Sequence, residues 1–313
     1  MRGFILYLRN YLRNTSLVTL FFTILFTGAL VVLNYTFGIE RRLRDLHPWY
    51  LSLGGFLAFY LFVFFSVWGL QYAGGKRLQA GSPRRMFLLM TLGPLYFALK
   101  MLHWDMMPLL TRLFSVPWNH YALITLQIPA KLLLLFALLW FCWKTDEPGL
   151  APRGWLSGYG LTAKGFRVGP YFLLLAMMIP LVALASTRPD FLHTYPKVKN
   201  IAFLGAYTKP VWPWQLLYEL SYGLDFLNIE LFFRGLLVIG LSRYAGEAAI
   251  LPMAAFYCTI HFGKPLGECI SSFFGGLILG VLAYRSRSVL GGLIVHLGLA
   301  WMMEVGGWMG GGL

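Results

Sequence analysis

The sequence is poor in charge. Of its 313 residues only 12% are Asp, Glu, Lys or Arg, whereas 58% are hydrophobic. Soluble globular domains carry about twice that share of charge, and disordered chains are still more polar. The composition therefore excludes both classes and predicts an integral membrane protein.

Acidic residues are scarcer than basic ones. The sequence has 12 Asp and Glu against 26 Lys and Arg, which gives a net charge of +14. The basic residues are scattered among segments between apolar runs and form no continuous stripe. A nucleic-acid partner is therefore not expected, because it would require a basic face. Membrane lipids with anionic headgroups are the expected counter-charge.

Cysteine is also rare. Cys142, Cys258 and Cys269 lie in or beside apolar runs and form no C-x-x-C pair. This pattern indicates neither a disulfide framework nor a thiolate metal site. We expect the three thiols to pack as small hydrophobic side chains.

Long apolar runs are what the sequence has in abundance. Crossing the hydrocarbon core takes roughly 20 mostly apolar residues. Candidate segments are 15–37, 50–73, 86–102, 119–143, 170–187, 214–241, 248–263, 268–284 and 289–309. Because 86–102 and 248–263 are short, we predict an all-α, polytopic transmembrane bundle of about eight or nine helices.

The N-terminal segment, Met1 to Asn14, carries three arginines before the first apolar run, with no small-residue cleavage site after that run. It therefore predicts a retained first helix. If all nine segments span, the loops on the side of the N-terminus hold more Lys and Arg, despite Arg41, Arg42 and Arg44 on the other side. We expect a cytoplasmic N-terminus, in the plasma membrane of a bacterium.

A break in composition divides the chain. Residues 144–169 contain prolines, glycines and charges that their surroundings lack. We therefore predict N-terminal transmembrane helices over 1–145, a polar linker over 146–169 and a second group of helices over 170–313.

Ionisable side chains within apolar segments are the main pointer to function, because they are costly at membrane depth. Glu230 and Arg234 share one face of the segment 214–241, one helical turn apart. His261 ends a later apolar segment and His296 lies near the middle of the last one. The alternative interpretation is a buried structural ion pair and two histidines satisfied within the core.

Two further features concern packing. Gly276 and Gly280, four residues apart, predict a close approach by another helix. Glu268 falls in the first turn of its helix, where the helix dipole favours a carboxylate. We interpret both as structural.

Three motifs, read in order, suggest a family. They are Glu230-Leu231-Phe232-Phe233-Arg234-Gly235, then Tyr257 to His261, then Arg287-Ser288 followed by a helix with His296. Together they resemble the CAAX-processing and bacteriocin-processing family of intramembrane proteases, of the type II CAAX prenyl endopeptidase kind. That family has Glu-Glu-x-x-x-Arg, Phe-x-x-x-His and His-x-x-x-Asn on three helices. The resemblance covers about 170–313.

Three positions depart from the family pattern. Ile229 stands where the family has its first glutamate, which is taken to activate water, Tyr257 stands for phenylalanine and Ala300 for asparagine. Either Glu230 has taken over the task of the missing glutamate, or the protein no longer cleaves peptides.

The resemblance implies a membrane endopeptidase acting on a peptide or protein near the membrane surface, such as a prenylated C-terminus or a bacteriocin leader. Our hypothesis is that Glu230 and His261 hold and activate water, His296 stabilises the oxyanion and Arg234 orients the carboxylate. One carboxylate and two histidines are also enough for a zinc site. The sequence has no H-E-x-x-H signature, and the cofactor is left open.

Two other functions compete. Ile229 and Ala300 favour a catalytically inactive relative that acts as a binding or scaffold protein. A transporter could relay protons through Glu230, His261 and His296. The sequence lacks the paired broken helices that would indicate such a transport site.

Overall fold

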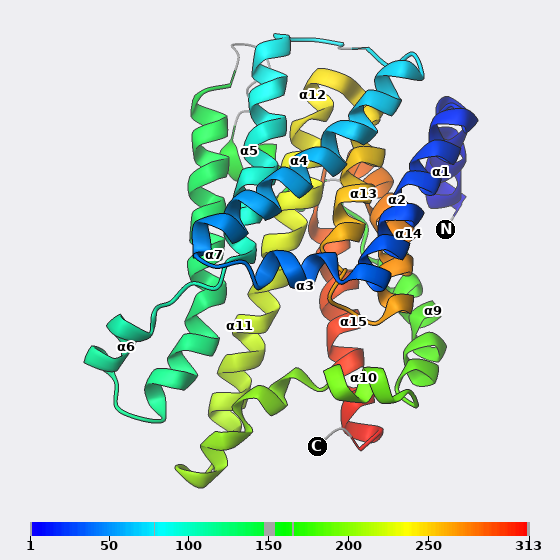
Figure 1. Ribbon diagram of the computed structural model, residues 1–313. Helices are drawn as coiled ribbons and strands as arrows, with labels where there is room; N and C mark the ends of the chain where they lie inside the picture. Colours follow the sequence, from blue (N-terminus) through cyan, green and yellow to red (C-terminus); the bar gives the residue numbers. More distant parts are fainter. Residues whose placement is uncertain (1, 78, 147–153, 165, 312–313) are drawn as a thin grey trace. The chain divides into compact units, whose positions relative to one another are not determined.

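The computed structural model describes residues 2–77, 79–146, 154–164 and 166–311, and all regular structure in these ranges is helical. Each predicted apolar segment forms a helix (Figure 1), which confirms the all-α prediction. These helices are α2 (Leu17–Phe37), α4 (Trp49–Ala73), α5 (Pro83–Met101), α7 (Trp118–Lys144), α9 (Gly169–Ala185), α11 (Trp212–Glu230), α13 (Ile250–Thr259), α14 (Leu266–Ser286) and α15 (Leu290–Met309).

Shorter elements fill the connections. They are α1 (Arg2–Asn14), α3 (Ile39–Arg44), α6 (Met107–Leu113), α8 (Trp155–Gly158), α10 (Pro189–Thr194), η1 (Lys197–Ala206), η2 (Leu231–Gly240), α12 (Ser242–Ala245) and η3 (Gly246–Ala249). Local signals set several boundaries: Ser16 caps α2 by accepting a hydrogen bond from the Thr19 N–H, and Gly38 ends α2 at a left-handed φ of 63°. Such a φ favours glycine.

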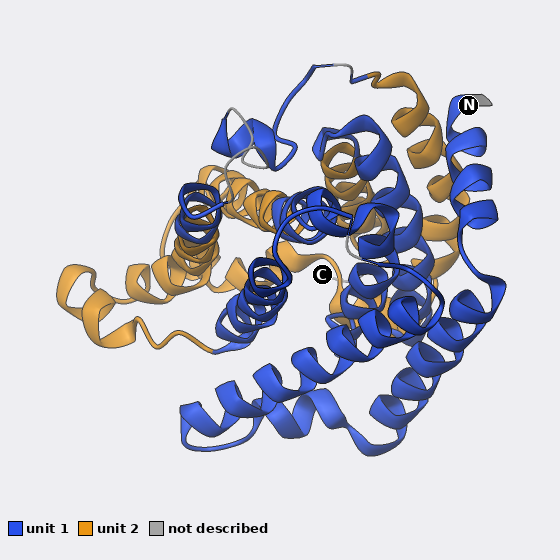
Figure 2. Ribbon diagram, turned by 90° about the horizontal axis from the view of Figure 1, so that it is seen from above, with its two compact units in different colours: residues 1–102, 137–166, 230–291 blue, residues 103–136, 167–229, 292–313 orange. Residues whose placement is uncertain are grey.

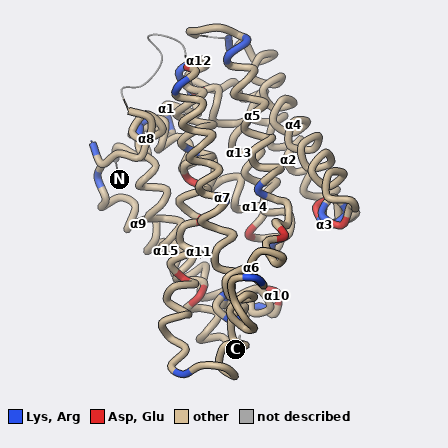
Figure 3. The backbone as a smooth tube through the Cα atoms, turned by 90° about the vertical axis from the view of Figure 1, so that its left-hand side faces the viewer, with Lys and Arg blue, Asp and Glu red and all other residues tan. Residues whose placement is uncertain are grey.

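Five of the described helices are long and apolar enough to cross a membrane, namely α2, α4, α7, α14 and α15. Charged residues are few and lie mainly near helix ends and in connecting segments (Figure 3). Large apolar side chains such as Leu17, Phe21 and Leu133 are well exposed, as expected where the surrounding medium is hydrocarbon. The protein is therefore an integral membrane protein.

The chain forms two compact units (Figure 2). Unit 1 comprises residues 1–102, 137–166 and 230–291, and unit 2 comprises 103–136, 167–229 and 292–313. Within the predicted linker, residues 147–153 and 165 lie outside the described residues, and the described part contains α8.

The core of unit 1 is built from η2 and α13, in which every residue is buried. Helix α13 packs against α14, α4 and α2. An aromatic cluster fills the space around it: Tyr60, Phe97, Phe232, Phe233 and Phe256 have ring centroids 4.7–6.0 Å from their neighbours. At 1.5 Å per residue α13 is about 15 Å long, half the hydrocarbon thickness, so it is a core helix.

The glycine pair of α14 allows the close approach to α13 that its spacing predicts. A Cβ at Gly280 would lie 2.6 Å from Met253 Cε and 3.2 Å from Ile250 Cγ2. A Cβ at Gly276 would lie 3.0 Å from Tyr257 Cδ1. Because these gaps are tighter than ordinary contacts, the two glycines allow α14 to pack closely against the helix that leads to His261.

In unit 2, α11 is held to the N-terminal part of α7 by two hydrogen bonds to backbone carbonyls. Tyr121 Oη donates to Trp214 O at 2.8 Å, and Ser221 Oγ donates to Thr125 O at 2.5 Å. A second group of apolar contacts joins α9 and α10 to α15, through Val182, Phe191, Tyr195, Leu299 and Met302.

Candidate functional site

Glu230 and Arg234 form a closed ion pair inside unit 1. Arg234 Nη1 lies 3.1 Å from Glu230 Oε1, and neither side chain has exposed surface. This confirms that the two residues share a face. Glu230 ends α11, and Arg234 lies in η2, a π-helix of ten residues. π-Helical turns are rare and frequently mark functional sites.

Tyr257 of α13 contacts the same guanidinium. Arg234 Cζ lies 4.3 Å from the centre of the Tyr257 ring, which is a cation–π contact. Such a contact stabilises a buried guanidinium, because the ring face carries partial negative charge. The Arg234 cation is thus held between a carboxylate on its own helix and an aromatic ring on the next.

His261 lies in the turn after α13 and makes two contacts with Tyr257, a ring contact and a hydrogen bond. The rings of Tyr257 and His261 meet edge to face, with centroids 4.7 Å apart, and His261 Nδ1 lies 2.9 Å from Tyr257 O. A carbonyl oxygen can only accept a hydrogen bond, so Nδ1 carries the proton. In the neutral ring Nε2 is then left as the basic nitrogen.

The turn that carries His261 is fastened to the N-terminal helices of unit 1. Asn34 Nδ2 donates to Phe262 O at 3.1 Å, and Tyr35 Oη donates to Lys264 O at 2.5 Å. Lys264 pairs with Glu268 at 3.7 Å. Helix α2, which lies outside the segment of family resemblance, therefore helps to position His261.

The turn between α14 and α15 is fixed in a similar way. Ser288 Oγ donates to Thr162 O at 2.8 Å, and the Val289 N–H donates to Gly160 O at 2.9 Å. Arg287, at a positive φ of 54°, donates from Nη1 to Ser242 Oγ at 2.7 Å. The Arg-Ser motif therefore anchors the beginning of α15 to unit 1.

In unit 2, His296 is partly buried on α15 and its ring stacks on Phe226 of α11, with centroids 6.1 Å apart. Glu304 lies two turns further along α15 and is 8% exposed. Its carboxylate accepts hydrogen bonds from the backbone N–H of Lys197, at 2.7 Å, and of Val198, at 3.2 Å. Glu304 thus holds the beginning of η1 against α15.

Of the four predicted site residues, Glu230, Arg234 and His261 belong to unit 1 and His296 belongs to unit 2. Glu230, Arg234, Tyr257 and His261 form a series in which each side chain contacts the next, called the contact chain below. The sequence did not predict the role of Tyr257 in linking the guanidinium to the histidine. An aromatic residue four positions before a histidine on a helix was the available signal, since such residues share a face.

Metal ligands do not cluster in the described part of the chain: no three His, Cys, Asp or Glu side chains gather there closely enough to hold an ion. The chemical resources at hand in unit 1 are a carboxylate, a guanidinium and an imidazole nitrogen. A carboxylate or imidazole can take a proton from water, and a guanidinium or a protonated imidazole can donate to a developing oxyanion.

Comparison with protein families gives one match. Residues 215–302 match the model of the family described as type II CAAX prenyl endopeptidase Rce1-like. No curated protein and no solved structure matches the chain. The match runs from α11, of which it covers all but the first three residues, through η2, α12, η3, α13 and α14 into most of α15, and it confirms the resemblance predicted from the three motifs. It supports a membrane endopeptidase of the CAAX type in general.

Proposed function

From this Rce1-like segment, we propose that the chain is an integral membrane endopeptidase that hydrolyses a peptide bond near the membrane surface. The observation that carries the proposal is the contact chain Glu230–Arg234–Tyr257–His261, which lies wholly within the matched segment. It brings together a carboxylate at the end of α11, a cation in η2 and a basic nitrogen in the turn after α13.

Glu230 is the proposed general base. Its carboxylate has no exposed surface while the ion pair is closed, so water must gain access when substrate binds. Arg234 then orients the carboxylate, and the buried surroundings strengthen each electrostatic contact. Glu230 takes over the task that Ile229 cannot perform.

His261 is the proposed partner of Glu230 in holding the water. Its protonated Nδ1 is engaged by Tyr257 O, so Nε2 is the ring nitrogen that would accept a hydrogen bond from water in the neutral state. Because the ring is fixed by the turn after α13, water held there would have a defined orientation.

His296 is the proposed donor to the oxyanion, and its stacking on Phe226 supports a fixed ring orientation. The proposed substrate is a peptide or protein in the membrane, such as one with a prenylated C-terminus. We further propose a bacterial plasma membrane with the N-terminus in the cytoplasm, since the basic loops favour that side.

The test is cleavage of membrane-anchored peptides by the purified protein in lipid nanodiscs, with and without a chelator. We expect native activity and a loss of at least 100-fold in Glu230→Gln, because a general base contributes about 10²–10⁴-fold. Glu219→Gln, a carboxylate on α11 outside the ion pair, is the matched control and should keep activity. Inhibition by the chelator would establish a metal requirement.

One substitution of His261 sharpens the assignment. The amide nitrogen of Asn reproduces the position of Nδ1, whereas that of Gln reproduces Nε2. His261→Asn should therefore fold normally, by keeping the bond to Tyr257 O, and yet lose activity. Normal turnover by His261→Asn would exclude Nε2 from the chemistry.

A second candidate function is a catalytically inactive relative that binds other membrane proteins. The closed, unexposed pair of Glu230 and Arg234 favours it, as do Ile229 and Ala300. In that case Glu230→Gln would lower stability with no cleavage to lose. Cleavage by the native chain at a rate equal to that of Glu230→Gln would contradict the proposed mechanism.

A further inference from the structure

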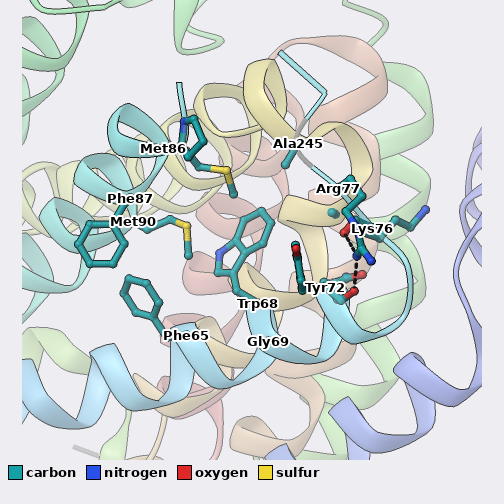
Figure 4. Close-up of a pocket in the computed structure, with 13 residues that line it drawn as sticks. Phe65, Trp68, Gly69, Tyr72, Lys76, Arg77, Met86, Phe87, Met90 and Ala245 are labelled. Atoms are coloured by element: carbon teal, nitrogen blue, oxygen red, sulfur yellow. Dashed lines mark hydrogen bonds between the residues drawn. The ribbon is translucent and has the colours of Figure 1, made fainter. Parts of the chain in front are cut away.

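Unit 1 contains a pocket that the proposed chemistry does not use. It has a volume of about 720 Å³ and lies where α4 ends and α5 begins (Figure 4). This volume is within the usual range for small-molecule sites, about 300–1,000 Å³. Glu230, Arg234 and His261 are not among its lining residues.

Most of the lining is apolar, and it includes two flexible methionine side chains. Figure 4 shows the Trp68 ring in the middle, with Met86 and Met90 on one side and Tyr72 on the other. Phe65 and Phe87 complete the apolar wall. Methionines adapt to flexible apolar ligands, and aromatic faces provide large contact areas. This wall suits a hydrocarbon chain.

One end of the pocket is cationic. Lys76 and Arg77 line it just beyond the end of α4. Arg77 Nη1 donates to Tyr72 O at 2.6 Å and to Lys76 O at 3.0 Å, and its guanidinium lies 4.2 Å from the centre of the Tyr72 ring. Lys76 Nζ donates to Asn14 O at 2.9 Å. Both cations are therefore held in place at this end.

These two cations have no carboxylate partner within 4.0 Å among the residues that the structure describes. Their hydrogen bonds are to neutral carbonyls, so neither cation forms an ion pair at that distance. An anionic ligand group would supply the missing charge.

The pocket also lies along the end of a helix that is long and apolar enough to cross a membrane. Helix α4 is an apolar span that ends at Ala73, and the cations follow directly. Phe65 lies eight residues earlier, so the apolar wall reaches about 12 Å into the span at 1.5 Å per residue. An amphiphile with its anion at Lys76 and Arg77 would place its tail along Trp68.

We propose that this pocket binds one anionic membrane phospholipid, with its phosphate at Lys76 and Arg77 and an acyl chain against Trp68, Met86 and Met90. The proposal does not depend on the proposed peptidase activity. A lipid in this position would join the end of α4 to the beginning of α5 in unit 1.

Gly69 offers a direct way to fill the pocket. It lines the pocket on α4, and a Cβ added there meets no atom within 4 Å. Gly54 is equally open on the same helix but does not line the pocket. Gly69→Leu and Gly54→Leu are therefore a matched pair, since both make the same change in an open helical position.

The experiment is titration of the delipidated full-length protein in detergent with phosphatidylglycerol or phosphatidylcholine of the same chain length, with bound lipid counted by native mass spectrometry. We expect one tight phosphatidylglycerol and a preference over phosphatidylcholine of roughly tenfold to thirtyfold, from about 1 kcal/mol per basic residue. Glycerol phosphate, which has the anion without the chain, should not bind.

The variants separate the two parts of the site. Lys76→Gln combined with Arg77→Gln should remove the headgroup preference, Gly69→Leu should remove the tight site, and Gly54→Leu should behave as the native chain. Equal binding of both lipids by the native protein would overturn the proposal. So would an unchanged tight site in Gly69→Leu, or binding of glycerol phosphate as tight as that of the lipid.

Discussion

Two buried carboxylates, one in each unit of the molecule, are neutralised in different ways. Glu230 in unit 1 has no exposed surface and pairs with the guanidinium of Arg234. Glu304 in unit 2 is 8% exposed and accepts two backbone N–H groups. Glu230 therefore depends on another charge, whereas Glu304 depends on the local backbone conformation.

The difference bears on which site is suited to the proposed chemistry. The carboxylate of Glu304 accepts hydrogen bonds from backbone N–H groups at the start of η1. These bonds hold the start of η1 in place. A carboxylate held by a movable side chain can exchange that partner for water or substrate. Arg234 itself is secured by Tyr257, so the guanidinium retains one contact when the carboxylate takes another partner.

The largest effect is expected from Arg234→Met, which removes the cation and leaves Glu230 as an uncompensated buried charge. Breaking one side of a buried ion pair typically costs about 3–5 kcal/mol. We therefore expect the free energy of unfolding in detergent to fall by about this amount, together with a loss of any peptidase activity.

The matched control is the double variant Glu230→Gln/Arg234→Met. Replacing both partners of a buried pair is often nearly neutral for stability, so the double variant should regain most of what Arg234→Met loses. If the double variant were as unstable as the single one, the ion pair would not be the source of the cost.

A smaller effect is expected at Glu304. Glu304→Ala removes the acceptor of two backbone N–H groups, and hydrogen bonds to a charged group contribute about 1.5–3 kcal/mol. Because this site is slightly exposed, water can take the place of the carboxylate as an acceptor for part of the two N–H bonds. The free energy of unfolding should therefore fall by about 1.5–3 kcal/mol. Thermal unfolding of the full-length protein in detergent would measure it.

Glu268→Gln provides the comparison for Glu304, because Glu268 makes only a 3.7 Å pair with Lys264 and is partly exposed. A change of less than about 1 kcal/mol is expected there, as for other exposed pairs. An equal loss in Glu304→Ala and Glu268→Gln would mean that the two N–H bonds add nothing.

Much of the fold was predictable because hydropathy directly reports which segments enter the membrane. The nine apolar segments all form helices, and the Gly276 and Gly280 spacing correctly predicted a close helix contact. The π-helical geometry of η2 was not predictable from the sequence, since its residues read as an ordinary continuation of α11. Nor does hydropathy reveal that α13 is a buried core helix, because an apolar run looks the same against lipid and against protein.

The site was predictable in part for a similar reason. The four-residue spacing of Glu230 and Arg234 correctly predicted their pairing, because side chains at that spacing meet on one helix. The contribution of Tyr257 depends on how α13 packs against η2, which is a tertiary contact without a sequence period. The backbone N–H partners of Glu304 lie more than a hundred residues away in the sequence, and no local pattern indicates them.

The smallest effect is expected at Tyr257, which tests how firmly Arg234 is held. Tyr257→Phe keeps the ring face beneath the guanidinium and removes only the hydroxyl, so the cation–π contact should survive and the free energy of unfolding should fall by less than in Tyr257→Leu. Tyr257→Leu removes the ring and should cost about 1–2 kcal/mol more, from the lost cation–π contact and the poorer packing. Both variants keep the backbone carbonyl that binds His261 Nδ1. Their unfolding energies and cleavage rates should therefore fall together if Tyr257 acts only by holding Arg234. A normal cleavage rate in a destabilised Tyr257→Leu would show that the position of the guanidinium is irrelevant to the chemistry.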